Sequence, residues 1–101
     1  MEGFLKFHIN KIMQATIEIS MYPLMDDYLP GIKDFIERLQ GTEGLSVVGN
    51  TMSTQVFGDF DLVMDTVKEE IRRSYEEFGK SVLVCKFIGR NLDPALNPHG
   101  D

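Results

Sequence analysis

The feature that most constrains the fold of this chain is an alternation of apolar and polar residues over positions 12–22, "IMQATIEISMY". Successive side chains of a β-strand point to opposite faces, so this alternation predicts a strand with one face on a core. The core-facing positions are Met13, Ala15, Ile17, Ile19 and Met21. The polar positions of the opposite face are Gln14, Thr16, Glu18, Ser20 and Tyr22.

Residues 23–41 instead repeat apolar side chains with the 3.6-residue period of an amphipathic helix. The apolar stripe consists of Ile32, Phe35, Ile36 and Leu39. Asp26 or Asp27 is predicted to cap this helix, because aspartate is a favoured N-terminal capping residue. Pro30 is predicted to lie in the first turn and Gly41 to end the helix.

A second amphipathic helix is predicted over residues 59–79, with Asp59 or Asp61 as its cap and Gly79 as its end. Its buried stripe is predicted to contain Phe60, Val63, Met64, Val67, Ile71, Tyr75 and Phe78. Both helices therefore have one apolar side, as expected of helices that pack against a sheet.

The remaining segments complete a recognisable order of elements. The stretches "GLSVVGN" and "STQVFG" are predicted to pair as a hairpin, and "KSVLVCKFIG" is predicted to be a last strand. Residues 91–101 contain two prolines and no period, which indicates a tail. The order β-α-β-β-α-β predicts a ferredoxin-like α+β fold, with both helices on one face of a four-stranded antiparallel sheet. At 101 residues the chain is predicted to be one domain, with its folded core at about residues 12–90.

The face of this sheet away from the helices, called the open face below, is predicted to be bare. Val82, Val84 and Lys86 lie on it if the intervening residues of the last strand face the helices. Exposed apolar surface of this kind marks interaction sites. The chain is therefore predicted to form a homodimer or homotetramer through the sheet.

Charge and composition exclude several function classes. The net charge of −6 argues against nucleic acid as a partner, because such binding needs clustered Lys and Arg. No apolar run is long enough for a membrane span and no signal peptide is recognisable, so a cytoplasmic protein is expected. His8 and His99 both lie in the terminal extensions, which predicts neither a metal site nor a Ser-His-Asp set. We therefore expect no catalytic residues, no metal and no enzyme activity.

Two motifs carry a resemblance to a known family. The stretch "ISMYPLMDDY" and, some thirty residues later, "NTMSTQVFGDFDLVM" resemble the YkoF-like thiamine-binding family, over about Thr16 to Phe87. The resemblance implies an oligomeric ferredoxin-like domain that binds thiamine or its hydroxymethylpyrimidine moiety without chemistry and without a cofactor. A structural or regulatory homo-oligomer with no vitamin ligand is the alternative.

The resemblance also suggests a ligand site, where the polar run of residues 50–55 meets the end of the first strand. Hydroxyl and amide groups can satisfy both the acceptors and the amine donor of an aminopyrimidine. An aromatic ring can stack on the heterocycle, and a carboxylate can stabilise the positive thiazolium. The expected ligand-binding residues are Glu18, Ser20, Tyr22, Asn50, Ser53, Thr54, Gln55 and Phe57.

Simpler interpretations of the same residues stay open. Asn, Ser and Thr often bond their own backbone in turns, so the polar run can be turn chemistry. Glu18 can be a surface carboxylate paired with Lys86. Four aspartates, Asp26, Asp27, Asp59 and Asp61, are expected to crowd one end of the sheet, which favours free thiamine over its pyrophosphate.

Overall fold

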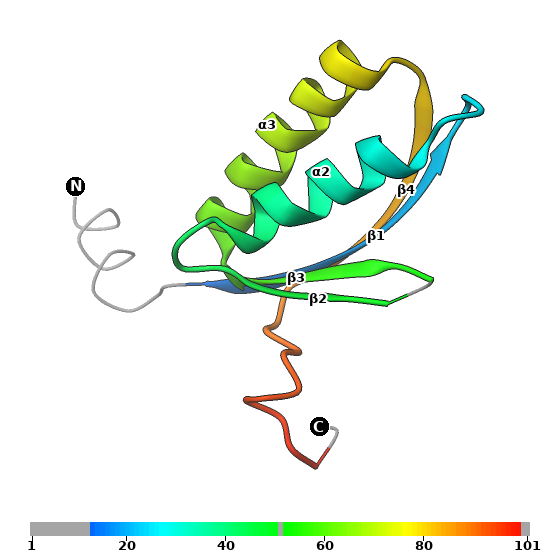
Figure 1. Cartoon of the computed structure of the whole chain (residues 1–101). Helices are drawn as coiled ribbons and strands as arrows, with labels where there is room; N and C mark the ends of the chain where they lie inside the picture. The colour runs from blue at the N-terminus through cyan, green and yellow to red at the C-terminus, as the bar shows by residue number, and fades with distance from the viewer. Residues whose placement is uncertain (1–12, 51, 100–101) are drawn as a thin grey trace, which may run out of the picture.

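The computed structural model describes residues 13–50 and 52–99, and His8 lies outside this part of the chain. Four strands form one antiparallel sheet in the order β2-β3-β1-β4, and both helices cover one of its faces (Figure 1). The elements are β1 (Gln14–Pro23), α2 (Leu29–Gln40), β2 (Ser46–Gly49), β3 (Thr54–Asp59), α3 (Phe60–Phe78) and β4 (Ser81–Ile88). The predicted ferredoxin-like βαββαβ fold is confirmed.

The core lies between the sheet and the two helices, as the alternation in β1 predicted. Ile17 pairs with Val56 of β3, and directly paired residues share a face, so both side chains point to the helices. Leu39 of α2 and Val63 of α3 close over them with no exposed surface. The buried cluster consists of Ile17, Ile19, Phe35, Leu39, Val56, Val63 and Val67.

The start of α2 differs from the sequence prediction. Tyr28 is the N-terminal cap and makes no side-chain capping bond, so the prediction of Asp26 or Asp27 was wrong. Pro30 lies in the first turn and Gly41 ends the helix, as predicted. Both aspartates therefore lie in the turn after β1, and neither of them caps the helix.

The helix α3 begins and ends as predicted. The Oδ2 atom of Asp59 accepts a hydrogen bond from the Leu62 amide at 3.1 Å, and Gly79 ends the helix with a φ of 85°. Tyr75 was predicted to be buried and is 45% exposed, whereas Ser74 is buried. A Cβ atom at Gly31 of α2 would lie 3.2 Å from the ring of Phe78, so the two helices approach each other closely here. The side of α3 next to Tyr75 is therefore enclosed between the helices.

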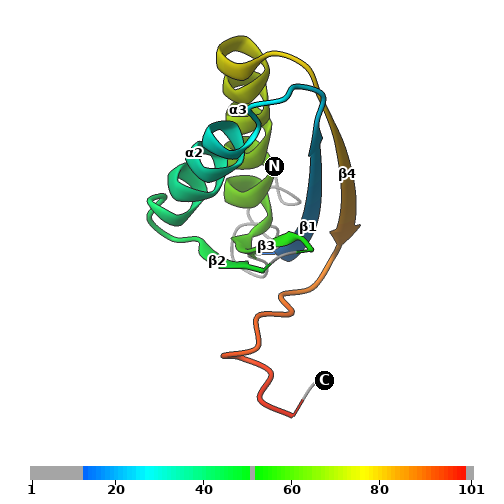
Figure 2. The same ribbon diagram turned by 45° about the vertical axis from the view of Figure 1, so that its right-hand side comes forward.

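The C-terminal segment, residues 89–99, is more than the free tail that the missing period indicated. It contains no helix or strand, but it is hydrogen-bonded to β1 on the open face. The Thr16 hydroxyl donates to the Arg90 carbonyl at 2.7 Å and accepts from the Leu92 amide at 2.9 Å. Asn91 donates to the Gln14 side chain at 2.9 Å. The segment then runs away from the sheet on the side opposite the helices (Figures 1 and 2).

Candidate functional site

Strand register divides the predicted ligand-binding residues between the two faces of the sheet. Glu18 pairs with Gln55 on the open face, and Ser20 and Tyr22 follow on the same side of β1. Thr54 pairs with Ile19, a core residue, and therefore faces the helices. The sequence predicted one site, whereas the structure shows two neighbouring sets on opposite sides of the hairpin end of the sheet.

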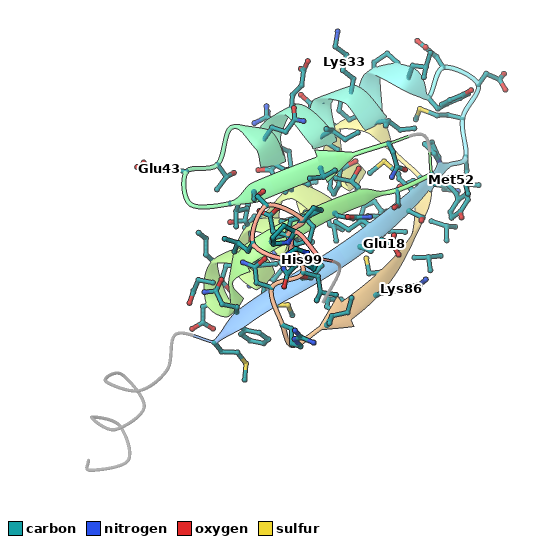
Figure 3. The ribbon with its side chains drawn as sticks, turned by 90° about the horizontal axis from the view of Figure 1, so that it is seen from below. Glu18, Lys33, Glu43, Met52, Lys86 and His99 are labelled. Atoms are coloured by element: carbon teal, nitrogen blue, oxygen red, sulfur yellow. The ribbon has the colours of Figure 1, made fainter. Side chains whose placement is uncertain are left out.

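The open-face set centres on Glu18. Its Oε2 accepts from the Ser53 hydroxyl at 2.9 Å, and its Oε1 lies 3.5 Å from Lys86 Nζ. Figure 3 shows Glu18 and Lys86 next to each other on β1 and β4. The hydrogen bond from Ser53 lowers the pKa of the Glu18 carboxyl, and Lys86 lowers it further, against an opposing effect of burial. The pairing of Glu18 with Lys86 agrees with the simpler interpretation of this residue.

Other groups on the open face leave polar and aromatic surface available. The Ser20 hydroxyl donates to the Met52 carbonyl at 3.4 Å, which is a long bond. Tyr22 is 56% exposed, so its ring can accept a stacking partner. Phe57 is only 1% exposed and offers no free ring face to a ligand. It pairs with Thr16, to which the C-terminal segment is bonded, and no pattern in the sequence predicted that bond.

Asn50 holds the turn between β2 and β3. Its side-chain oxygen accepts from the Met52 amide at 2.7 Å and from the Ser53 amide at 2.9 Å. The backbone amide of Asn50 donates to the Ser53 carbonyl at 3.0 Å. The turn interpretation therefore holds for the oxygen of Asn50. The side-chain NH₂ group makes no hydrogen bond within the described part of the chain and can still donate.

A cavity of about 90 Å³ lies on the helix side of the hairpin, and we call it the helix-side cavity. It contains Thr54, which is 6% exposed and whose hydroxyl has no hydrogen bond to any described residue. Its wall combines apolar side chains with a nearly equal amount of polar surface. The lining residues are Ile19, Met21, Ile32, Phe35, Ile36, Asn50, Met52, Ser53 and Thr54. The cavity is smaller than the roughly 300–1,000 Å³ of typical ligand pockets, so it can hold only part of a ligand.

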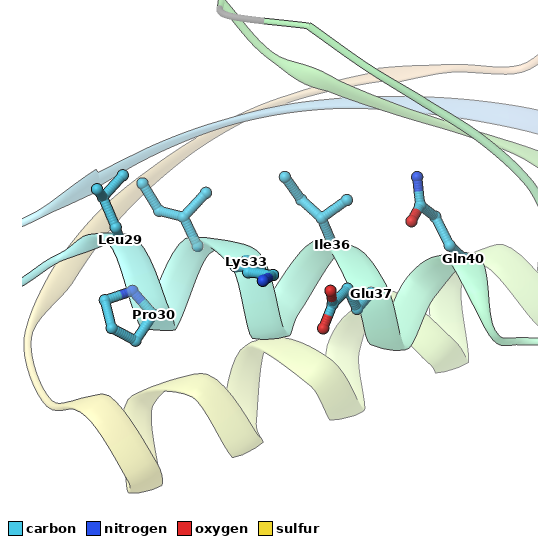
Figure 4. Close-up of a pocket in the computed structure, with 7 residues that line it drawn as sticks. Leu29, Pro30, Lys33, Ile36, Glu37 and Gln40 are labelled. Carbon is cyan, nitrogen blue, oxygen red and sulfur yellow. The ribbon is translucent and has the colours of Figure 1, made fainter.

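Sequence analysis missed the part of this cavity that α2 supplies. Ile32 and Ile36 were assigned to the buried stripe, yet both also line an open groove of about 770 Å³ on the outer side of α2. Figure 4 shows Leu29, Ile36 and Gln40 along one side of the helix. The register of Thr54 against Ile19 turns Thr54 toward the helices, and the sequence alone does not reveal this register.

The four aspartates expected at one end of the sheet lie at opposite ends. Asp59 pairs with Gln14 at the start of β1, and Asp61 follows in the first turn of α3. Asp26 and Asp27 come after Pro23, at the other end of β1. The expected acidic cluster is therefore absent, because β1 separates the two pairs by its full length.

Other site classes find no support in the described part of the chain. Residues 13–50 and 52–99 contain no cluster of metal-binding side chains. Neither described helix combines the length and apolar character needed to cross a membrane. Burial raises the pKa of the Cys85 thiol, which packs against the core from β4.

The fold and the hairpin-end residues define a ferredoxin-like α+β domain with a small cavity beside its sheet. The model of the YKOF-related family matches residues 14–90, so the chain belongs to this family, and the expected resemblance is confirmed. No curated protein matches the chain.

Solved structures agree with this assignment. A protein of Streptococcus pneumoniae is 25% identical, with a TM-score of 0.72 over 85% of this chain and 98% of that chain. A proposed thiamine biosynthesis/salvage protein of Thermotoga maritima is 24% identical, with a TM-score of 0.70 over 85% and 98%. A hypothetical protein of Methanocaldococcus jannascii is 25% identical, with a TM-score of 0.66 over 78% and 82%.

Proposed function

We propose that this chain is a non-catalytic cytoplasmic protein that binds thiamine or its hydroxymethylpyrimidine moiety. The observation that carries the proposal is the helix-side cavity, where Thr54, Asn50 and Ser53 lie beside apolar side chains of β1 and α2. Membership in the YKOF-related family and the thiamine-related description of the Thermotoga maritima neighbour support the same ligand class.

The chemistry of the cavity suits an aminopyrimidine ring. The Thr54 hydroxyl can both donate and accept, and the Asn50 NH₂ group can donate to a ring nitrogen. Ile19, Phe35 and Ile36 supply apolar walls for the ring faces. The volume of about 90 Å³ equals the share of about three water molecules at about 30 Å³ each, so the cavity takes only one edge of the ring. The rest of thiamine would lie outside, toward the groove on α2.

The open face offers a second position for the same ligand. Tyr22 would stack on a ring there, and Ser20 and Gln55 would supply hydrogen bonds. Glu18 would stabilise the thiazolium charge, although Ser53 and Lys86 already occupy its two oxygens. We favour the helix-side cavity because Thr54 lines it and its hydroxyl has no hydrogen-bond partner among the described residues.

Titration calorimetry with thiamine and with hydroxymethylpyrimidine tests the proposal and separates the two positions. Thr54→Val keeps the shape of the side chain and removes the hydroxyl, so it should weaken binding roughly tenfold. Tyr22→Leu should leave binding unchanged. Thr42→Val is the matched control, because its hydroxyl bonds the Arg38 carbonyl at the end of α2.

The opposite pattern, with loss in Tyr22→Leu and none in Thr54→Val, would place the ligand on the open face. If neither compound binds the wild-type chain, the vitamin-binding proposal fails. The alternative, a homo-oligomeric domain without a vitamin ligand, would then stand. Exposed Tyr22, Val82 and Val84 on the open face favour self-association in either case.

A further inference from the structure

The C-terminal segment divides the open face into two unequal environments. Near the start of β1, Thr16 is 3% exposed and Phe57 is 1% exposed, although register places both on the face away from the helices. Toward the end of β1, Tyr22 and its partner Val82 are about half exposed. One half of the open face is thus covered within the chain, and the other half is free.

The cover is anchored by two side chains of β1, Thr16 and Gln14, and Thr16 makes two of the bonds. The Thr16 hydroxyl is hydrogen-bonded to the two residues that flank Asn91. It donates to the Arg90 carbonyl and accepts from the Leu92 amide. The segment beyond this anchor is held in shape by its own bonds. The Asn97 side chain donates to the Asn91 carbonyl at 3.0 Å and to the Asp93 carbonyl at 2.8 Å, and Asp93 is buried. The segment is therefore bonded to the open face at β1 and held in one conformation by its own hydrogen bonds.

We propose that the C-terminal segment prevents a second copy of this chain from stacking its sheet over the Thr16–Phe57 half of the open face. Two sheets that pack face to face lie about 10 Å apart. The segment leaves the open face in the direction from which the second sheet would approach (Figures 1 and 2). It therefore occupies the space in which the partner's strands would lie.

The surface itself points to a second copy as the excluded partner. A two-fold interface needs a self-complementary patch, and the open face carries Glu18 and Lys86 beside exposed Val84. Release of the segment would add the large ring of Phe57 to this apolar surface. The family match ends at residue 90, so the covering residues lie beyond the part shared with the family. Contacts between copies are then confined to the free half and the β4 edge.

The test uses full-length variants with two measurements. Thr16→Val removes both bonds of the Thr16 hydroxyl, leaves the bond between Asn91 and Gln14, and keeps a β-branched side chain in the strand. Amide exchange in the C-terminal segment should become roughly tenfold faster, since two hydrogen bonds are lost. Sedimentation velocity at matched concentrations should then show larger assemblies than the wild-type chain forms. Thr42→Val should change neither measurement. The double variant Thr16→Val/Asn97→Ala should act more strongly than Thr16→Val alone.

Three results would overturn the proposal. The first is a wild-type chain in which the Leu92 amide exchanges as fast as an unprotected amide. The second is a double variant whose segment exchanges no faster than in the wild type, which would mean that Thr16 does not anchor the segment. The third is a released segment with no change in assembly size. A monomeric wild type with assembling variants would still support the proposal, even though self-association of the wild type would then be excluded.

Discussion

Replacement of Asn50 with alanine should destabilise the chain, because the side-chain oxygen holds the β2–β3 turn. That oxygen accepts from two amides, at 2.7 and 2.9 Å. A neutral hydrogen bond contributes about 0.5–1.5 kcal/mol, and the exposed position of this turn favours the lower values. The two bonds together therefore stabilise the chain by about 1–2 kcal/mol. For a domain of this size that loss lowers Tm by roughly 5–15 °C.

Asn50→Asp is the matched control. A carboxylate keeps both acceptor positions, removes the NH₂ donors and adds a charge that is solvated at this exposed turn, so its Tm should stay near that of the wild type. Thermal unfolding followed by circular dichroism gives the two values. Calorimetry on the same proteins tests the ligand contact separately. If the Asn50 NH₂ group binds the pyrimidine, Asn50→Asp should weaken binding without lowering Tm.

Two outcomes would refute this reasoning. If the alanine variant melts with the wild type, the side-chain oxygen does not stabilise the turn. If the alanine and aspartate variants lose the same stability, the NH₂ group matters and the two accepted bonds do not. Full ligand binding by Asn50→Asp would remove Asn50 from the proposed site and leave the turn argument intact.

Three further predictions concern charge and assembly. Ser53→Ala should raise the pKa of Glu18 measured by carboxyl NMR. Because the folded pKa is lowered, the stabilisation from this carboxylate is complete above the unfolded pKa and is lost as pH falls through the folded pKa; an unchanged pKa would contradict the role of Ser53. Free thiamine should bind more tightly than its pyrophosphate, because the groove on α2, toward which the rest of thiamine would lie, carries Glu37 as well as Lys33 and so offers no net positive charge; equal affinities by calorimetry would contradict this. Val84→Glu should weaken self-association by burying an unpaired charge, and sedimentation equilibrium should approach the 11.5 kDa monomer; an unchanged assembly would remove Val84 from the interface.

The fold was predictable because its signals are periodic and local. The alternation in β1 identified Ile17 and Ile19 as core residues, and the aspartate before α3 identified its cap. The start of α2 was less predictable, because Tyr28 caps it without a side-chain bond and leaves no compositional mark. The start of a helix is therefore predictable from the sequence where a side chain caps it. It is not predictable where no side chain caps it.

The candidate site was predictable in composition and not in arrangement. Thr54 and Gln55 are neighbours in the sequence, yet the pleat turns them to opposite faces, and only the register against β1 shows which face each takes. The burial of Phe57 depends on a segment bonded to Thr16 across 74 residues of sequence. No periodic pattern encodes such a contact, so the sequence indicated an available aromatic ring where the structure has a covered one.

The position of Ser53 between the two faces links the proposed ligand to proton binding. Ser53 lines the helix-side cavity, while its hydroxyl donates to Glu18 on the open face. A ligand that draws this hydroxyl away would raise the pKa of Glu18 toward its ordinary value and so cause proton uptake at acidic pH. By thermodynamic reciprocity, protonation of Glu18 would in turn strengthen binding of that ligand. Two sites on opposite faces of the sheet would then be energetically coupled through the Ser53 hydroxyl.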